Sequence, residues 1–300
     1  ATPSIESYYE AINTNSLFKL KERYNNSLLP KVCVIDMKEE RQEKNYTLFS
    51  RTLKEQVKQT IENGNQVIFL INRRGFSSYT QCMECGTIIE CPKCAIPLIY
   101  HSSTDSYKCH YCNYEIKTPK CKKCGSENFE HFGMGSQKVE TVAKAHFPDY
   151  RIERLDSDSL SKKNEHLEIL KRFQKKEIDI LIGTQMIAKG LDNKNVTLVG
   201  VINADLSFNL PDYRSSERGF SILTQVAGRS GRGEKEGKVI FQTYNKENIY
   251  LNNAKEQNYE EFYENEIQMR EMLDYPPFSK MIRVILSSKN EFRAEKSALE

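Results

Sequence analysis

Apolar positions along the chain fall into short continuous runs that alternate with stretches of helical periodicity. The run 66–72 (QVIFLIN) is almost wholly apolar, as expected for a strand buried on both faces of a parallel sheet. The preceding stretch, 48–63, is amphipathic, and Gly64 follows where a helix commonly ends. Further strands are predicted at 31–37, 151–155, 179–182, 196–202 and 238–243, with helices at 4–15, 162–176, 215–227, 258–273 and 290–299. This alternation predicts an α/β fold in which helices cover both faces of a parallel sheet.

Eight of the nine cysteines interrupt this pattern between residues 82 and 124, arranged as four CxxC pairs. One CxxC turn offers two thiolates, and two such turns form a closed tetrahedral site that holds zinc at about 2.3 Å from each sulfur. The segment therefore predicts two structural zinc ions. A disulfide framework is less favoured because the chain has the features of a protein from a reducing compartment. A catalytic zinc is disfavoured because four thiolates leave no open position.

The spacing alone does not settle which pairs share a metal. Sequential pairing would close a site with only five residues between its two turns, which is tight. Nested pairing uses the 14-residue gap between Cys94 and Cys109, which suits the hairpin of a zinc ribbon, and it brings the ends of the insert together. We prefer nested pairing. It assigns Cys82, Cys85, Cys121 and Cys124 to one zinc, and Cys91, Cys94, Cys109 and Cys112 to the other.

Composition narrows the class of protein only moderately. A length of 300 residues predicts about two domains, and 38% hydrophobic residues are enough for a packed core. The net charge of +3 is too mild to identify a nucleic-acid binder. No apolar run is long enough to cross a bilayer and no signal peptide opens the chain, so we expect a cytoplasmic protein without a membrane partner. The opening Ala1-Thr-Pro-Ser4 lacks an initiator methionine, which suggests a partial chain.

Polar and basic residues follow several of the predicted strands. Ligands of an open α/β sheet bind beyond the carboxyl ends of its strands, and the arginine fork suits phosphate. Arg229 and Arg232 are therefore candidates for binding phosphate. The alternative is that they form a solvated basic helix end, which the helix dipole favours. The chain contains neither a G-x4-G-K-[ST] loop nor an acidic DExx segment, so it holds at most half of an ATP site. The strand-end motifs are 72–75 (NRRG), 183–185 (GTQ), 203–205 (NAD) and 228–232 (GRSGR).

Two of these motifs resemble those of a known helicase class. The stretches 183–190 (GTQMIAKG) and 225–232 (QVAGRSGR) resemble motifs V and VI of superfamily 2 helicases. The segment 72–75 followed by four CxxC pairs resembles the PriA family of bacterial primosomal replication-restart helicases. Residues 1–4 resemble the end of motif III in that family, and 275–278 (YPPF) resembles the entry to its C-terminal domain.

The resemblance implies an ATP-driven DNA helicase that moves 3′ to 5′ and acts on stalled forks and D-loops in replication restart and primosome assembly. It implies the end of a first RecA-like lobe at 1–39, a second lobe at 40–81 and 125–252, a zinc insert at 82–124 and the start of a C-terminal α+β domain at 253–300. The implied partners are forked and single-stranded DNA, single-stranded DNA-binding protein and other primosome proteins. Because Walker A and DExH motifs are missing from these residues, we expect the chain alone to be inactive. The family's zinc pairing is nested.

Carried over by position, Arg229 and Arg232 would reach the γ-phosphate of ATP bound with Mg²⁺, and Gln225, Gly228 and Asp192 would help to form that site. The implied DNA contacts are Asn72, Arg73, Arg74, Gly183, Thr184, Lys189 and Gly190. The chain departs from the family pattern at 193–194 (NK) and at 133–137 (GMGSQ), which leaves local DNA contacts in doubt.

Two alternative functions remain. One is a non-enzymatic zinc-ribbon adaptor that binds DNA or replication proteins, although an adaptor has no use for the paired arginines. The other is a different superfamily 2 translocase, which would not explain the eight cysteines. Lysines and aromatic residues between the cysteines suit either single-stranded DNA or simple solvation of a small domain.

Overall fold

The computed structural model describes residues 2–20, 30–71, 79–94, 96–101, 104–132, 136–155, 165–184, 193–209, 212–228, 236–282, 284, 286 and 291–299. These fall into two compact units. The larger is formed by Lys19–Phe262, and the smaller by Pro3–Phe18 with Tyr263–Glu300. None of the helices in the described part of the chain has the length and apolar character needed to cross a membrane.

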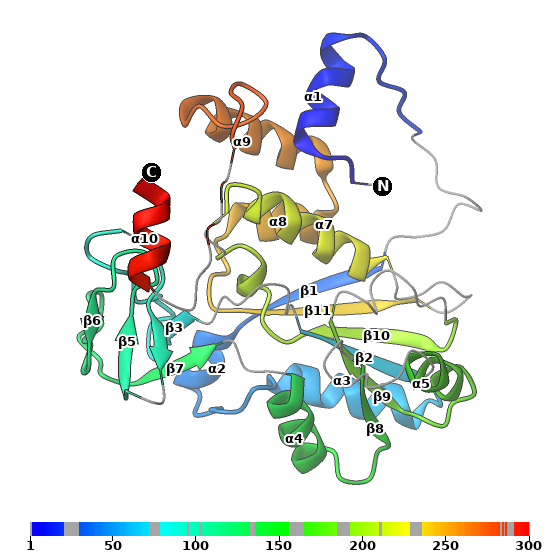
Figure 1. The fold of residues 1–300 in the computed structure, drawn as a ribbon. Helices are drawn as coiled ribbons and strands as arrows, with labels where there is room; N and C mark the ends of the chain where they lie inside the picture. The colour runs from blue at the N-terminus through cyan, green and yellow to red at the C-terminus, as the bar shows by residue number, and fades with distance from the viewer. Residues whose placement is uncertain are drawn as a thin grey trace. The chain divides into compact units, whose positions relative to one another are not determined.

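A six-stranded parallel sheet forms the centre of the larger unit (Figure 1). Every neighbouring pair in the sheet is parallel, which confirms the α/β fold predicted from the alternation of apolar runs and helices. The strand order is β1-β11-β10-β2-β9-β8. The strands are β1 (Lys31–Asp36), β2 (Gln66–Leu70), β8 (Ile152–Leu155), β9 (Ile180–Gly183), β10 (Val196–Val201) and β11 (Lys238–Thr243).

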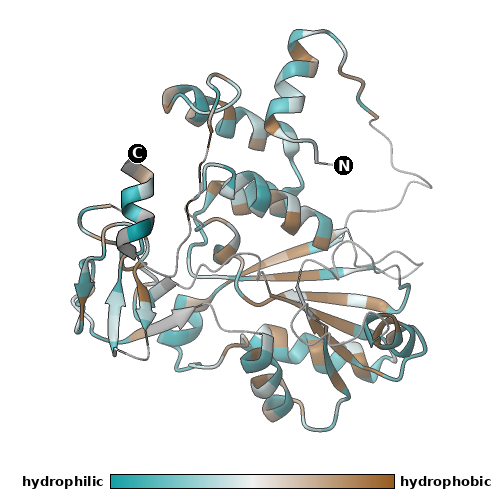
Figure 2. Ribbon diagram, in the orientation of Figure 1, coloured by the Kyte–Doolittle hydropathy of each residue, from teal (hydrophilic) through white to brown (hydrophobic). Residues whose placement is uncertain are grey.

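Helices cover both faces of this sheet. In Figure 1, α3 and α4 lie below the strands, whereas α7 and α8 lie above them. Figure 2 shows the strands as mostly hydrophobic ribbons and the helices as two-toned, with polar residues on their outer sides. The helices of the larger unit are α2 (Met37–Gln42), α3 (Arg51–Glu62), α4 (Ser136–His146), α5 (Glu165–Gln174), α7 (Ser215–Ala227) and α8 (Ile249–Glu256), with the 3₁₀ turn η2 (Asp205–Ser207).

Helix α3 has defined ends and packs closely on the central strands. The close packing is possible because the facing strand carries a glycine. Ser50 caps the helix by accepting a hydrogen bond from the Leu53 N–H at 3.1 Å. Gly64 follows the helix with φ of +71°, in the left-handed region that glycine tolerates. Opposite the helix, a Cβ on Gly200 would lie 2.9 Å from Leu53 Cδ1, so any larger residue would force the Leu53 side chain to shift.

Strand β1 corrects one domain boundary. We expected residues 1–39 to belong to a preceding lobe, yet β1 pairs in parallel with β11 as an edge strand of this sheet. Its apolar alternation is that of any sheet strand, and its partner is more than 200 residues away, so pairing could not be inferred locally. The boundary at 252/253 likewise cuts through α8. The limits of the other expected domains stay predictions.

The cysteine-rich segment is an insert between β2 and α4. Its base is an antiparallel pair in which β3 (Tyr79–Cys82) lies beside β7 (Phe129–Phe132), so the two ends of the insert meet as the nested pairing required. Beyond this base, β4 (Ile99–His101), β5 (Ser106–Lys108) and β6 (Glu115–Ile116) form a three-stranded antiparallel sheet.

The smaller unit is held together by a buried arginine. It contains α1 (Ile5–Asn13), most of α9 (Tyr259–Met272) and α10 (Glu291–Leu299). Arg270 is only 1% exposed, and its guanidinium contacts Glu266 at 3.0 Å and Glu6 at 3.2 Å. It also donates to the Pro276 carbonyl, so one side chain joins both helices to the following turn.

Candidate zinc centres and strand-end site

The four CxxC turns share one backbone design. In each turn the N–H of the first cysteine donates to a carbonyl five residues later, and these four hydrogen bonds measure 2.8–2.9 Å. The repeated bond curls each turn so that both of its thiols point to the same side. The pairs are Cys82 with Thr87, Cys91 with Ile96, Cys109 with Tyr114, and Cys121 with Ser126.

A left-handed residue closes three of the turns. Gly86, Asn113 and Gly125 have φ values of +72°, +56° and +74°. Glycine adopts this conformation without strain, and asparagine is the residue that tolerates it next best. The corresponding residue of the turn that starts at Cys91 lies outside the described residues. The same local chemistry therefore builds turns that differ widely in sequence.

The thiols gather in two groups, and the grouping is the nested one. Within each group all four sulfurs lie within 4.8 Å of one another. Cys82 and Cys124 are 3.5 Å apart, and Cys91 and Cys112 are also 3.5 Å apart. Zinc bonds of about 2.3 Å would set sulfurs roughly 3.8 Å apart in a tetrahedral site, so each group fits zinc after a small expansion. The groups are Cys82, Cys85, Cys121 and Cys124, and Cys91, Cys94, Cys109 and Cys112.

The crowding of these thiols is reflected in their titration. Burial raises the pKa of Cys85, but hydrogen bonds with Thr87 and neighbouring thiols outweigh it and bring the pKa down to about 6. In the other group, hydrogen bonding with Cys112 raises the pKa of Cys94 to about 12. A set of close thiols thus ionises only in part by itself. A dication at the centre allows all four to become thiolates.

His110 lies within a CxxC turn but belongs to neither thiol group. Its Nε2 is 2.8 Å from Nε2 of His101 on β4, and the two rings stack with centroids 5.0 Å apart. Burial, and then the nearby His101, lower the pKa of His110. The imidazoles link the second thiol group to its own hairpin, and the four sulfurs suffice for the metal.

The carboxyl ends of the central strands form the other candidate site. The Ile71 N–H donates to the Gly183 carbonyl at 2.9 Å, which places the residue before Asn72 beside the end of β9. Thr184 follows Gly183 and is 7% exposed. On the other side of β2, the Ile202 N–H donates to the Leu70 carbonyl at 3.1 Å. Three of the sequence-predicted strand ends therefore meet at one edge.

Asp205 joins two of these strand ends. One carboxylate oxygen accepts from the Thr243 hydroxyl, and the other accepts from the Tyr244 N–H at 2.6 Å. Its pKa is raised, first because the carboxyl is almost completely buried and also because Asp36 is near. The side chain therefore ties the end of β10 to the end of β11, and it has little contact with solvent.

Helix α7 carries two of the predicted nucleotide-site residues. Gln225 donates from Nε2 to the Ser221 hydroxyl at 3.1 Å. Gly228 is the C-cap and has φ of −68°, which any residue can adopt, so the backbone does not require glycine there. The other predicted nucleotide and DNA residues lie outside the described residues: Asn72, Arg73, Arg74, Lys189, Gly190, Asp192, Arg229 and Arg232.

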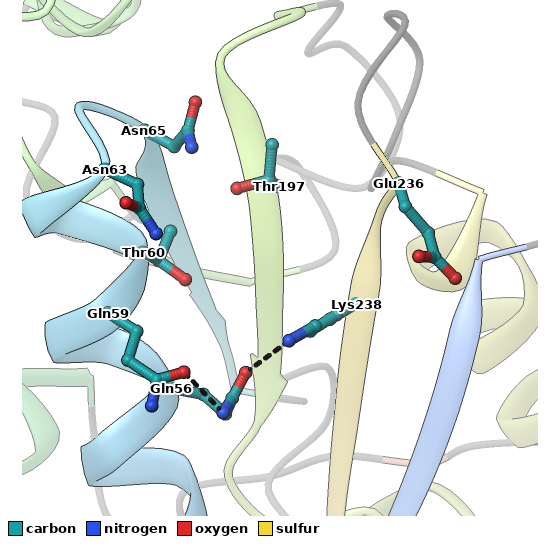
Figure 3. Close-up of a pocket in the computed structure, with 8 residues that line it drawn as sticks. All are labelled: Gln56, Gln59, Thr60, Asn63, Asn65, Thr197, Glu236 and Lys238. Carbon is teal, nitrogen blue, oxygen red and sulfur yellow. Dashed lines mark hydrogen bonds between the residues drawn. The ribbon is translucent and has the colours of Figure 1, made fainter.

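A small polar pocket lies away from both sites. It has a volume of about 170 Å³ and lies between the end of α3 and the amino ends of β10 and β11 (Figure 3). Lys238 Nζ donates to Gln56 Oε1 at 2.9 Å across one side of it. None of the residues singled out from the sequence lines it. The lining residues are Gln56, Gln59, Thr60, Asn63, Asn65, Thr197, Glu236 and Lys238.

Sequence reasoning missed the contact between the insert and the sheet. Met83, inside the first CxxC turn, packs with Met37 and Tyr244, which belong to the sheet domain. The only local signal was an apolar methionine in an otherwise polar turn, and nothing in the sequence showed what would bury it.

Two family models match different parts of the chain, one mainly the sheet domain and the other the cysteine-rich insert. Residues 127–234 match the helicase conserved C-terminal domain, and residues 91–117 match the PriA DNA helicase Cys-rich region domain. The solved structure of RecG bound to a three-way DNA junction covers 90% of this chain and 26% of its own, at 12% identity and a TM-score of 0.45.

Two curated relatives are similar over nearly the whole chain. Replication restart protein PriA of Bacillus subtilis (strain 168) is 42% identical over 300 residues, covering 99% of this chain and 37% of the relative. Replication restart protein PriA of Borreliella burgdorferi is 39% identical over 303 residues, covering 100% of this chain and 45% of the relative. The chain thus spans less than half the length of these relatives.

The parallel sheet, its strand-end motifs and the cysteine-rich insert define a RecA-like helicase lobe with a zinc module. Within that class, the chain belongs to the PriA family of replication restart helicases.

Proposed function

We propose that the protein containing this chain is an ATP-dependent DNA helicase that translocates 3′ to 5′ and restarts replication at stalled forks and D-loops. The observation that supports this most strongly is the 42% identity with a replication restart protein over 99% of the chain. An α/β lobe whose strand ends meet at one edge and a cysteine-rich insert are both consistent with it.

In this proposal the carboxyl edge of the sheet serves ATP and DNA together. Arg229 and Arg232 follow α7 and approach the γ-phosphate of ATP bound with Mg²⁺, while Gln225, Gly228 and Asp192 help to shape the site. Arginine fingers accelerate related phosphoryl transfers by about 10³–10⁵. Gly183 and Thr184, at the end of β9, contact the DNA strand together with Asn72, Arg73, Arg74, Lys189 and Gly190.

The zinc ions are structural in this proposal. Four thiolates complete a tetrahedral site, so no position is open for water or substrate. Bound zinc would stabilise the turns of a segment that has little hydrophobic core of its own. Zinc and the cysteine residues would thus fix the surface of the insert. The proposed binding partners of the protein are forked and single-stranded DNA, single-stranded DNA-binding protein and other proteins of the primosome.

The chain by itself should bind zinc and bind DNA weakly without turnover, since its sequence contains no Walker A loop and no DExH segment. The proposed setting of the complete protein is the bacterial cytoplasm. A zinc-ribbon adaptor without enzymatic activity is the alternative.

The test measures DNA-stimulated ATP hydrolysis by the complete protein and by its Arg229→Ala variant. We expect strong stimulation that falls at least 10³-fold in the variant, in line with other arginine fingers. Arg218→Ala is the matched control, because this α7 arginine is half exposed and pairs with Asp212 at 2.8 Å on the surface of the helix. No hydrolysis by the unaltered protein, or equal rates in both variants, would favour the adaptor.

A further inference from the structure

The first CxxC turn is buried against the sheet domain. Met83 is 7% exposed and packs with Met37 at the start of α2 and with Tyr244 after β11. We call this set the docking cluster. It consists of Met37, Met83 and Tyr244, with the partly buried Ile35, Ile88 and Leu206 packed around them. A metal-binding turn therefore shares a hydrophobic cluster with the carboxyl edge of the sheet.

Gly86 brings the same turn into backbone contact with the sheet domain. Its φ is +72°, and a Cβ built on it would lie 3.0 Å from Tyr244 Cβ and 3.1 Å from the Tyr244 carbonyl oxygen. Gln81 donates from Nε2 to the Gly86 carbonyl at 2.7 Å and so holds this peptide in place. A side chain at this position would therefore push against the Tyr244 backbone and force it to move by a few tenths of an ångström.

Contacts continue from Tyr244 to the strand end beyond it. The Tyr244 N–H donates to Asp205, and Leu206, the next residue, lies in the docking cluster. The turn η2 therefore contacts the zinc insert on one side. On its other side it packs on α7, where a Cβ on Gly219 would lie 2.6 Å from Phe208 Cε1. Helix α7 then leads to Gln225 and Gly228.

In the described part of the chain, the hydrophobic cluster of the second thiol group contains no residue of the sheet domain. Its hydrophobic cluster is formed by residues 89–116 alone, all within the insert. The members are Cys91, Leu98 and Cys109, with Ile89, Cys94, Ile96, Tyr107, Tyr114 and Ile116 packed around them. The two groups have the same four-thiolate chemistry but different neighbours.

We propose that the Cys82/Cys85/Cys121/Cys124 group positions the carboxyl edge of the sheet, whereas the other group stabilises only its own hairpin. The four cysteines of the first group would hold zinc, which would fix the Cys82 turn. That turn packs on Tyr244 and on Leu206 of η2, and η2 packs on α7. The expected effect of this positioning on ATP turnover rests on the proposed function. The structural link between the first thiol group and the sheet edge does not depend on that function.

Two glycines provide a matched test, because Gly86 and Gly125 close the two turns of this same group. Their φ values are +72° and +74°, but a Cβ on Gly125 would meet nothing within 4 Å. Hydrogen exchange of the complete protein would be followed by mass spectrometry in Gly86→Ala and Gly125→Ala. Because overpacking a tight contact shifts opening equilibria about tenfold, residues 203–208 and 242–246 should exchange about tenfold faster in Gly86→Ala alone.

A second pair of variants covers the case in which Gly86→Ala no longer binds zinc. Cys124→Ser disrupts the first group and Cys112→Ser the second, and zinc content would be measured for both. We expect faster exchange at 203–208 and 242–246 only in Cys124→Ser, with the effect of Cys112→Ser confined to 89–116. Equal effects of both variants at the sheet edge, or none from either, would overturn the linkage.

DNA-stimulated ATP hydrolysis of the same four variants adds the functional readout. We expect turnover to fall in Gly86→Ala and Cys124→Ser and to stay closer to normal in Gly125→Ala. If the unaltered protein hydrolyses no ATP, the proposed function fails, and the exchange experiment still decides the linkage.

Discussion

Gln242, next to the last residue of β11, accepts a hydrogen bond from the Ser50 N–H at 2.7 Å through its side-chain oxygen. Its amide nitrogen donates to the carbonyls of Leu48 and Ile202 at 2.8 and 3.1 Å. The side chain is fully buried. One glutamine thus satisfies three backbone groups and connects the start of α3 with the ends of two strands.

Replacing this amide with an apolar group of similar size should be costly. Gln242→Leu leaves two buried backbone groups and the partly buried Leu48 carbonyl without their partner, and each buried group costs about 1–3 kcal/mol, so we expect a loss of roughly 2 kcal/mol or more. Urea unfolding would measure the change. Gln59→Leu is the control, since Gln59 lies on the exposed side of α3, and it should shift the midpoint little.

Arg270 should be similarly sensitive for an electrostatic reason. Arg270→Ala removes the cation that both the buried Glu266 and the partly exposed Glu6 contact, and breaking a buried ion pair typically costs about 3–5 kcal/mol. Thermal unfolding followed by circular dichroism would report it. Exposed Arg218 serves as the comparison, because removing its pair with Asp212 should cost at most about 1 kcal/mol. Similar losses for the two variants would argue against a special role of burial.

The carboxylate of Asp179 should stabilise the fold in a way that is lost in acid. Burial raises its pKa, but hydrogen bonds from the side chain and N–H of Arg151 outweigh burial, and the pKa is lowered overall. A carboxyl with a lowered folded pKa stabilises the fold above its unfolded pKa of about 3.9, and this stabilisation disappears as the pH falls through the folded value. Unfolding measured between about pH 5 and pH 2 should therefore be flatter in Asp179→Asn than in the unaltered chain. Parallel curves would contradict this.

Metal analysis should separate the cysteines by group. Cys112→Ser is expected to reduce the zinc content from two ions to one, whereas Cys33→Ser, which alters an exposed cysteine outside both groups, should leave two. Zinc affinity should fall as the pH is lowered, because protons compete for thiols such as Cys94 whose pKa is raised to about 12. Zinc release to a chromogenic chelator at several pH values would test this. Loss of both ions in Cys112→Ser would mean that the groups are not independent.

The zinc ligands and the sheet were accessible from sequence because their signals are local. Four CxxC spacings indicate two four-thiolate sites, and the apolar run before Asn72 indicates a buried strand. The nested preference came from loop length, and the structure shows the same grouping of sulfurs. Gly64 could be placed as a helix end because the left-handed conformation favours glycine there.

Only the tertiary structure decided which residues far apart in the sequence are in contact. The pairing of β1 with β11 moved a domain boundary that the local apolar pattern could not place. The roles of Gln242 and Arg270 depend on partners that packing brings together. Burying a polar side chain is tolerated only when hydrogen-bonding partners surround it, and the sequence does not show those partners. The contact of Gly86 with Tyr244 likewise distinguishes two thiol groups that the sequence presents as equivalent, because spacing specifies ligands but not what the folded turn rests against.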